Sequence, residues 1–506
     1  MGDIKRYFNS LKVDEKVKKF ELLIEIKKLG FLENDPRLKC FYNILNDIDD
    51  INYEQFYKLI SSNQLLFHKI FKKDLIITDF NDFTENIHTI YEETSKNKDG
   101  NVASYIPQLA RVDPEQYGIS ICTIDGQRLN IGDTNVDFTV QSCTKVVNYG
   151  NALEELGTEK VHHFVGREPS GQAFNELTLN KGGKPHNPLI NSGAIMTTSL
   201  IKNNDVHSDR FDYIMNIWNK LAGGMYKIGF NNSVYLSEKR TADRNYALAY
   251  FMKENIGFPE NTDLDQTLEL YFQCCSIEVN TEALSVVAST LANGGVNPFT
   301  GEKIWSSDTV KNVLSMMLMC GMYDYSGEHA FNIGIPSKSG VAGAIMTVIP
   351  NVMGIVTWSP RLDDIGNSSK GVKFCKLFGD MFNFHIFDNM NDMKINPLQN
   401  RYNSFNIQEF SKLCEASKNG DLNYLKKLYN CGVNMSQSDY DGRTALHLAC
   451  CEGHTDVVKF LINIVNVNRE PIDRWNNKPI DDALTNGHLE IMNLLSENNF
   501  DDDIHN

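Results

Sequence analysis

The sequence predicts a multidomain protein with a helical N-terminal domain, a central α/β domain and a C-terminal array of short helical repeats. Three observations support this prediction. Apolar residues recur at helical spacing through residues 1–95, strand-like segments stand near both ends of residues 96–395, and one motif returns every 33 or 34 residues near the C-terminus. The 506 residues suffice for two to four domains, each with its own core.

Residues 1–95 are expected to form the helical domain. The segment "VKKFELLIEIKKLGF" carries apolar residues at positions i, i+3, i+6 and i+7, and Gly30 offers a stop. The residues expected on the buried face of this helix are Val17, Phe20, Leu23 and Ile24. The polar segment "TSKNKDGN" (94–101) is expected to be a hinge into the next domain.

The α/β domain is predicted over residues 96–395. The segment "YGISICTIDGQRLNIGD" (117–133) alternates apolar and polar residues around an Asp-Gly pair, which is a strong hairpin signal. The segment "AGAIMTVIPNVMGIVTWSP" (342–360) contains two further strand-like runs joined through Pro350 and Asn351. Long helical patterns lie between these segments. We therefore expect one sheet that distant parts of the chain complete.

The C-terminal hundred residues repeat. The segments "KNGDLNYLKKL" (418–428), "CEGHTDVVKFL" (451–461) and "TNGHLEIMNLL" (485–495) carry Gly420, Gly453 and Gly487 at separations of 33 and 34 residues, and "GRTALHLA" (442–449) precedes the second segment. This pattern resembles the ankyrin repeat, a stacked pair of helices, whereas an unrelated helical tail is the alternative. We expect ankyrin repeats over 411–500, after a linker over 396–410.

Composition excludes several classes of function. The net charge of −16 argues against a nucleic-acid partner. The 11 cysteines include no C-x-x-C and the 12 histidines no H-E-x-x-H, so neither a disulfide framework nor a metal site is expected. No apolar run approaches the ~20 residues of a membrane span. The first residues lack the apolar segment of a secretory signal peptide. They also carry Asp3 and Asp14, whereas mitochondrial presequences are poor in acidic residues. The cytosol is therefore favoured, and mitochondria are the alternative.

The segment "VQSCTKVVNYG" (140–150) brings two candidate nucleophiles together. If a helix begins near Ser142, then Ser142 and Lys145 share a face and Cys143 points elsewhere. S-x-x-K is the nucleophile and base arrangement of serine acyl-transfer enzymes that use no histidine. A serine at a helix N-terminus also lies near backbone N–H groups that stabilise an oxyanion.

A second element strengthens the prediction of an acyl-transfer site. Lys338, Ser339 and Gly340 resemble the K-T-G strand of serine acyl-transferases and lead directly into the late strands. Gly340 is expected to let substrate approach the backbone closely. The amide of Val341 is expected to complete an oxyanion hole with that of Ser142.

Ordered sequence blocks over residues 30–390 resemble the glutaminase family, and within it the kidney-type, phosphate-activated enzymes that carry C-terminal ankyrin repeats. The blocks are "YIPQLA", "ICTIDGQR", "QSCTK", "KPHNPLINSGAI", "SEKRTADRN", "YFQCCSIEV", "LANGG", "CGMYDYSG" and "KSGVAG". The resemblance implies a serine β-lactamase-like α/β fold and hydrolysis of L-glutamine to L-glutamate and ammonia through a glutamyl-serine intermediate. It also implies a homotetramer, activation by inorganic phosphate, and no metal or organic cofactor.

The resemblance assigns roles residue by residue. Ser142 corresponds to the nucleophile and Lys145 to its lysine partner, while the base is left open between Lys145 and Tyr323. The positions that correspond to substrate contacts are Tyr105, Ser142, Asn191, Glu238, Asn245, Tyr271, Tyr323 and the Val341 amide. These residue types suit a zwitterion, because a carboxylate pairs with the α-ammonium and neutral donors suit the α-carboxylate.

Three further points stay open from the sequence. Residues 166–187, with Gly and Pro at both ends, are either a lid over the site or an inert surface loop. The same framework could serve a β-lactamase or a transpeptidase, which a nitrocefin assay separates from a glutaminase. An inactive scaffold that binds partners through its ankyrin repeats is the alternative outside enzymes, and ammonia release from glutamine tests it.

Overall fold

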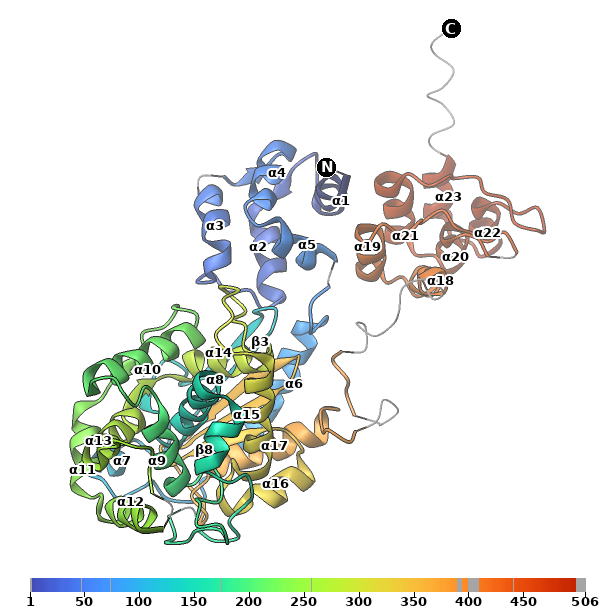
Figure 1. Ribbon diagram of the computed structural model, residues 1–506. Coiled ribbons are helices and arrows are strands. Elements are labelled where there is room, and N and C mark those ends of the chain that lie inside the picture. The colour runs from blue at the N-terminus through green and yellow to red at the C-terminus, as the bar shows by residue number, and fades with distance from the viewer. Residues whose placement is uncertain are drawn as a thin grey trace. The chain divides into compact units, whose positions relative to one another are not determined.

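The protein forms two compact units. The computed structural model describes residues 2–46, 48–72, 74–173, 175–255, 257–388, 394–398, 409–439 and 441–496 (Figure 1). One unit comprises residues 1–29, 33–78 and 398–506, and the other comprises 30–32 and 79–397. Most of the predicted linker, residues 399–408, lies outside the described residues. Among the described residues, no helix has both the length and the apolar character to cross a membrane.

The first unit is helical in both of its chain segments. Its N-terminal elements are α1 (Gly2–Leu11), β1 (Val17–Lys18), α2 (Lys19–Lys28), η1 (Pro36–Leu38), α3 (Lys39–Leu45), β2 (Asp50–Ile51), α4 (Tyr53–Ser61) and α5 (Gln64–Lys72). Its C-terminal elements are α18 (Glu409–Asn419), α19 (Leu422–Asn430), α20 (Ala445–Glu452), α21 (Thr455–Lys459), the π-helical turn η4 (Phe460–Val465), α22 (Pro479–Thr485) and α23 (Leu489–Ser496).

The buried face expected for the helix after residue 17 is wrong. Leu22 and Ile26 are the buried residues of α2, whereas Phe20 is 73% exposed. The reason is that Val17 does not belong to the helix but pairs with Ile51 between β1 and β2. The helix begins two residues later, at Lys19, and the face that it buries carries Leu22 and Ile26.

The C-terminal helices form the predicted repeat. In each of three helix pairs a glycine with positive φ separates the first helix from the second: Gly420 (73°), Gly453 (82°) and Gly487 (78°). Only glycine adopts this backbone conformation without strain, which explains why this residue marks the period. One apolar core runs through all three pairs, from Leu413 to Leu495.

The second unit contains the α/β domain. Its strands are β3 (Gly118–Thr123), β4 (Arg128–Gly132), β5 (Phe138–Thr139), β6 (Gly229–Phe230), β7 (Ile277–Val279), β8 (Ser337–Gly340), β9 (Ala344–Ile349) and β10 (Met353–Trp358). Its helices are α6 (Phe80–Ser95), α7 (Pro107–Ala110), η2 (Gln141–Cys143), α8 (Thr144–Phe164), α9 (Asn191–Leu200), α10 (His207–Leu221), α11 (Asn232–Arg240), α12 (Asp243–Asn255), α13 (Leu264–Cys275), α14 (Thr281–Ala292), α15 (Ser307–Cys320), η3 (Tyr323–Tyr325), α16 (Ser326–Asn332) and α17 (Ser369–Met381).

Distant segments complete the main sheet, as the sequence predicts. Its five antiparallel strands have the order β4-β3-β10-β9-β8, so the early hairpin pairs with the late one. Ile121 of β3 stands opposite Ile355 of β10. The Asp-Gly turn of the early hairpin places Gly126 at a φ of 83°. A separate three-stranded sheet has the order β5-β7-β6.

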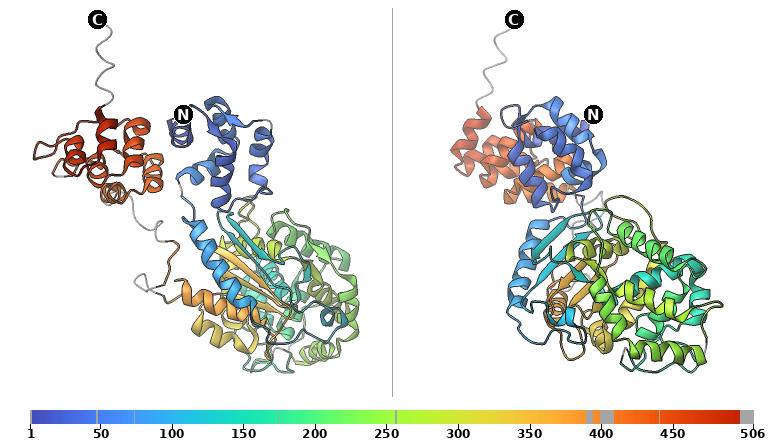
Figure 2. Two further views of the ribbon diagram at one scale, coloured as in Figure 1. Left: turned by 180° about the vertical axis from the view of Figure 1, so that it is seen from behind. Right: turned by 90° about the vertical axis from the view of Figure 1, so that its left-hand side faces the viewer.

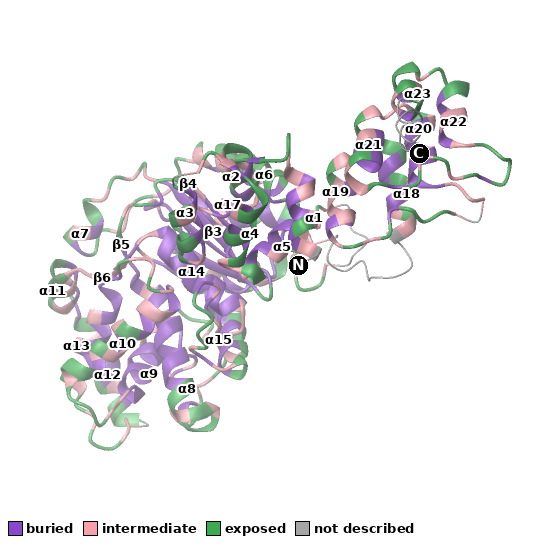
Figure 3. Cartoon of the chain, turned by 90° about the horizontal axis from the view of Figure 1, so that it is seen from above, coloured by how far each residue is buried: buried purple, intermediate pink, exposed green. Residues whose placement is uncertain are grey.

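Helices cover both faces of the main sheet. Helix α14 packs on β10, β3 and β9, while α17 and α6 contact each other on the other side (Figure 2). A Cβ atom at Gly354 would lie 2.4 Å from Cβ of Ala288, so a glycine is needed where α14 crosses β10. Residues 117–133 alternate apolar and polar types, and all six residues of β3 are nevertheless buried (Figure 3). Polar Ser120 is accommodated by a hydrogen bond of 2.8 Å to Thr281 of α14.

Candidate active site

The chain around Ser142 enters a helix, as expected. Ser142 is the middle residue of the short turn η2, and α8 follows directly at Thr144. The N–H of Val140 donates to the carbonyl of Ile277 at 2.8 Å, which ties the turn to the strand β7. Gln141 has a φ of 46°, an uncommon conformation for a residue other than glycine. Ser142 is only half-buried, so its hydroxyl can reach a bound molecule.

Lys145 lies one helical turn beyond Ser142 and is fully buried. Its Nζ donates to Oδ1 of Asn191, the first residue of α9, at 2.6 Å. Burial, followed by the nearby charge of Lys338, lowers the pKa of Lys145 to about 7. A lysine with this pKa is partly neutral at neutral pH and can accept a proton.

Cys143 faces away from this pair. Its thiol donates to the carbonyl of Lys338 at 3.6 Å, and the side chain is completely buried. Burial raises the pKa of Cys143 to about 11, so the thiol stays protonated and is a poor nucleophile.

The strand β8 passes close to the turn that carries Ser142. A Cβ atom at Gly340 would lie 3.0 Å from the carbonyl oxygen of Val140 and 3.3 Å from Sγ of Cys143. Gly340 therefore makes room for the backbone of the turn that carries Ser142. The sequence analysis suggested that this glycine makes room for substrate. Val341 follows β8 directly, and among the described residues its N–H has no backbone hydrogen-bond partner. It is available to an oxyanion.

Tyr323 approaches Ser142 from another segment, the turn η3. Its φ of 53° is strained for an aromatic residue. Burial raises its pKa, although the hydroxyls of Ser142 and Ser339 partly offset that rise. Nζ of Lys338 lies 4.9 Å from the centre of the Tyr323 ring. Lys338 is itself completely buried, and burial lowers its pKa to about 8.

Glu238 provides the carboxylate of the site. It stands on α11, is 8% exposed, and accepts a hydrogen bond of 2.6 Å from the hydroxyl of Tyr105. The same hydroxyl lies 3.2 Å from Oε1 of Gln141, which directly precedes the serine. Although 46% of Tyr105 is exposed, its hydroxyl end is enclosed by these two side chains. Burial raises the pKa of Glu238, so a cationic partner would stabilise its charged form.

The remaining predicted residues lie between these groups. Nδ2 of Asn191 donates to Oδ1 of Asn245, on α12, at 3.1 Å. Tyr271, on α13, is 4% exposed, and burial, followed by the neighbouring Cys275 and Glu238, raises its pKa. The predicted residues thus come from seven helices or turns, from the segment before α7 that carries Tyr105, and from the end of β8, and their polar groups converge.

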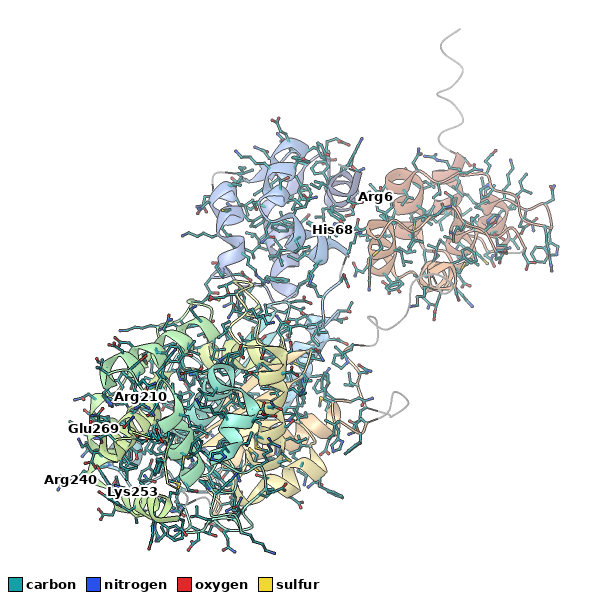
Figure 4. All side chains as sticks on the ribbon, viewed as in Figure 1. Arg6, His68, Arg210, Arg240, Lys253 and Glu269 are labelled. Carbon is teal, nitrogen blue, oxygen red and sulfur yellow. The ribbon has the colours of Figure 1, made fainter. Side chains whose placement is uncertain are left out.

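A buried arginine fixes the helix that presents Asn191. Arg210, labelled in Figure 4, lies on α10 and donates to the carbonyls of Ile201 at 2.9 Å and Thr198 at 2.8 Å. These carbonyls stand at the C-terminal end of α9, where few backbone N–H groups remain to satisfy them, and the carbonyl of Thr198 also accepts the N–H of Ile201 at 3.3 Å. The guanidinium group therefore caps α9 and holds Asn191 at its opposite end.

Sequence reasoning missed two members of this group. Gln141 was not singled out, although its place beside Ser142 in "QSCTK" was the available signal. Lys338 was noted only as part of a motif, because no spacing rule brings position 338 beside position 145. Among the described residues, no cluster of three or more His, Cys, Asp or Glu side chains could hold a metal ion.

The central domain and the C-terminal repeats both match known protein families. The family model for glutaminase matches residues 100–387, and the model for ankyrin repeats (3 copies) matches 413–506. The mitochondrial liver isoform of glutaminase from Rattus norvegicus is 43% identical over 506 residues, covering 98% of this chain and 84% of the relative. Putative glutaminase 2 from Caenorhabditis elegans is 42% identical, covering 94% of this chain and 82% of the relative.

A bacterial relative and a solved structure match the central part. The glutaminase of a Nostoc species is 44% identical over 305 residues, covering 60% of this chain and 90% of the relative. The solved structure of the probable glutaminase ybaS superimposes with a TM-score of 0.58 at 36% identity, covering 61% of this chain and 99% of that one. The predicted fold class, with its helical N-terminal region, glutaminase domain and ankyrin repeats, is confirmed. This chain belongs to the glutaminase family.

Proposed function

We propose that this enzyme hydrolyses L-glutamine to L-glutamate and ammonia through a glutamyl ester on Ser142. Neutral Lys145 takes the proton of the Ser142 hydroxyl while its oxygen attacks the side-chain amide carbonyl. The N–H groups of Ser142 and Val341 stabilise the oxyanion, and the proton then passes to the departing ammonia. Water repeats the attack on the ester and releases glutamate.

The observation that carries this proposal is the complete burial of Lys145, whose Nζ donates to the neutral amide of Asn191. Its pKa of about 7 gives a base that is neutral in part of the molecules at physiological pH. The pKa of Tyr323, by contrast, is raised, so a tyrosinate is the weaker candidate for the base. We assign Tyr323 the role of a hydroxyl that relays or orients the Ser142 proton.

Substrate recognition follows from the charges around the site. Glu238 supplies the anionic partner for the α-ammonium, and Tyr105 and Gln141 orient that carboxylate. Asn191, Asn245 and Tyr271 supply neutral hydrogen-bonding groups for the rest of the molecule.

The test is direct detection of the ester. Wild-type protein is mixed with excess glutamine, quenched in acid within milliseconds and analysed by intact mass. We expect a population heavier by one glutamyl group, mapped by peptide digestion to Ser142. Turnover of glutamine without any adduct at this residue, in wild type or in a deacylation-impaired variant, would contradict the covalent route.

We also propose a homotetramer activated by inorganic phosphate. The support is the resemblance to kidney-type enzymes over residues 30–390. The relatives from Rattus norvegicus and Caenorhabditis elegans also match this chain over 84% and 82% of their own length. Light scattering with and without phosphate, together with glutaminase rates in the same buffers, tests both points. A monomer whose rate ignores phosphate would contradict them.

The ankyrin repeats are proposed to bind a protein partner. The loop between α21 and α22 exposes two apolar side chains, since Ile472 and Trp475 are more than half exposed. Arg474 lies 4.3 Å from the centre of the Trp475 ring and is paired with Asp441 at 2.7 Å. Such a loop tip suits a partner with an apolar contact surface. Affinity capture with wild type and with Trp475→Ser tests it.

The location is proposed to be mitochondrial, the alternative left open from the sequence. The rat and mouse relatives that match 98% of this chain are named as mitochondrial isoforms. Fractionation of cells that express the protein from its own gene tests this proposal, and recovery in the cytosol alone would contradict it.

A further inference from the structure

A cavity of about 420 Å³ lies in the helical unit, which contains none of the candidate site residues. Its wall is formed by the end of α1, by α2 and α5, and by α19 of the first ankyrin repeat. This volume falls within the range of roughly 300–1,000 Å³ that is typical of pockets for small molecules. The glutaminase reaction leaves this cavity without a role.

Contacts between α19 and the N-terminal helices hold the two sides of the cavity together. Helix α19 packs against α1 and α5. Nδ2 of Asn430 donates to the carbonyl of Phe71 at 3.3 Å, and the thiol of Cys431 donates to the carbonyl of Lys72 at 3.7 Å. Both sides of the cavity therefore belong to one packed unit.

An unsatisfied polar atom belongs to the wall of the cavity. Asn430 lines the cavity and is only 6% exposed, and its Oδ1 has no hydrogen-bond partner among the described residues. The amide cannot turn over to satisfy this oxygen, because Nδ2 is needed by the carbonyl of Phe71. A buried acceptor without a donor is unfavourable. A bound molecule with an N–H or O–H group would remove this cost.

Helix α2 presents an apolar side and a charged edge to the cavity. Leu22 and Ile26, four residues apart, are buried and line the cavity together with Phe71 of α5. Glu21, next to Leu22, is exposed at the edge and forms no ion pair with any described residue. This wall suits a molecule with an apolar body and a cationic group.

The opposite side offers a positive charge. The lysines that line the cavity are Lys12, Lys28, Lys426 and Lys427. Lys12 and Lys28 are paired with Glu15 at 2.6 Å and with Glu25 at 3.7 Å, and Nζ of Lys427 lies 5.5 Å from the centre of the Tyr424 ring. Lys426 is half-buried and takes part in no ion pair within the described part of the chain. Its ammonium group is available to an anionic group.

We propose that this cavity binds a small zwitterion with an apolar body, the chemistry shared by an apolar amino acid and a short apolar peptide. The ammonium group of the ligand donates to Oδ1 of Asn430, and the carboxylate of Glu21 favours its positive charge. The carboxylate of the ligand pairs with Lys426, and its apolar body lies against Leu22 and Ile26. Such a ligand contacts α2 and α19 at once and stabilises the contact between the N-terminal helices and the first repeat.

Isothermal titration calorimetry on the full chain tests the class of ligand. The probes are L-leucine and L-leucyl-L-leucine, together with hexanoate and n-pentylamine, which keep the apolar body and carry only one charge. At least one zwitterion should bind, and both singly charged probes should bind at least about tenfold more weakly. The tighter zwitterion distinguishes a free amino acid from a peptide as the source. Binding by neither zwitterion, or equal binding of hexanoate, would overturn the proposal.

Variants of α19 test the place of binding. Lys426→Glu should weaken the zwitterion by about tenfold or more, whereas Lys426→Arg keeps the charge and should stay within about threefold. Asn423 is exposed and lines the cavity, so Asn423→Trp should obstruct it, with Asn423→Ala as the matched control. Thermal unfolding of each variant without ligand reports whether it is folded. Unchanged affinity in folded Lys426→Glu and Asn423→Trp would overturn the proposal.

The candidate active site also carries a carboxylate for an α-ammonium group, so Glu238→Gln is titrated in parallel. Binding in the cavity should be unchanged in Glu238→Gln, and Lys426→Glu should hydrolyse glutamine at the wild-type rate, because the two residues belong to different units. Loss of the calorimetric signal in Glu238→Gln, with Lys426→Glu unaffected, would assign the binding to the active site and overturn the inference.

Discussion

Lys145 and Asn191 are joined by a hydrogen bond of 2.6 Å between Nζ and Oδ1, and Lys145 is fully buried whereas Asn191 is half-buried. The partner in this bond is a neutral amide. Because Nδ2 of Asn191 donates to Asn245, the amide oxygen is kept toward the lysine. This arrangement keeps the pKa of Lys145 low, since a neutral amide does not favour the charged form as a carboxylate would.

The first prediction concerns the pH profile. In wild type, kcat/KM should rise as pH increases through about 7, because the base is the neutral amine, whose fraction grows above its pKa. Asn191→Asp adds a carboxylate beside Lys145 and should move this rise upward by at least about one pH unit. Asn191→Ala, which removes the bond without adding charge, should lower the rate without that upward shift. An unmoved profile in Asn191→Asp would exclude Lys145 as the base.

The second prediction separates Ser142 from its neighbour. Ser142→Ala should reduce turnover by a factor on the order of 10⁴ or more, because the nucleophile is gone. Cys143→Ser should keep most activity, since the new hydroxyl can still donate to the carbonyl of Lys338. Steady-state ammonia release measures both. The reverse outcome, with the cysteine essential and the serine dispensable, would refute the assignment of the nucleophile.

The third prediction tests recognition of the α-ammonium group. Glu238→Gln should reduce kcat/KM for glutamine by about 10²-fold or more, because it removes a buried charge-assisted hydrogen bond. Tyr105→Phe should cost less, since it only removes a group that orients the carboxylate. A glutamine analogue without the α-amino group should be a poor substrate for wild type. Equal kcat/KM for glutamine and this analogue would show that Glu238 has another role.

The fourth prediction concerns the ankyrin repeats. All the predicted site residues lie within residues 79–397, so a chain truncated after Gln399 should hydrolyse glutamine with kcat/KM close to that of the full chain. Solubility is a second measurement, because the first repeat covers part of the N-terminal helices: Nδ2 of Asn430 donates to the carbonyl of Phe71 at 3.3 Å. A loss of more than about tenfold with an unchanged mass by light scattering would mean that the repeats help to build the site.

Local rules recovered much of the site's chemistry. The spacing from Ser142 to Lys145 matters because one helical turn aligns two side chains whatever surrounds the helix. Local rules also predicted the turn at Asp125-Gly126 and the glycines that follow the first helix of each repeat. Their backbone conformations follow from the residue type. The identities of Glu238, Asn191 and Tyr271 as site residues came from resemblance to a family rather than from their own surroundings.

The features that the sequence did not predict depend on contacts between distant parts of the chain. The apolar pattern after residue 17 is ambiguous by itself, and pairing of Val17 with Ile51 sets where α2 begins. Helix α14, from a distant segment, packs against β3, whose six residues are all buried. The low pKa of Lys145 is likewise a tertiary property, because it requires burial and the approach of Lys338 from a strand 193 positions away. Sequence thus determined which groups are present and how they lie along one helix, while the packing of separate segments set the distances that give those groups their reactivity.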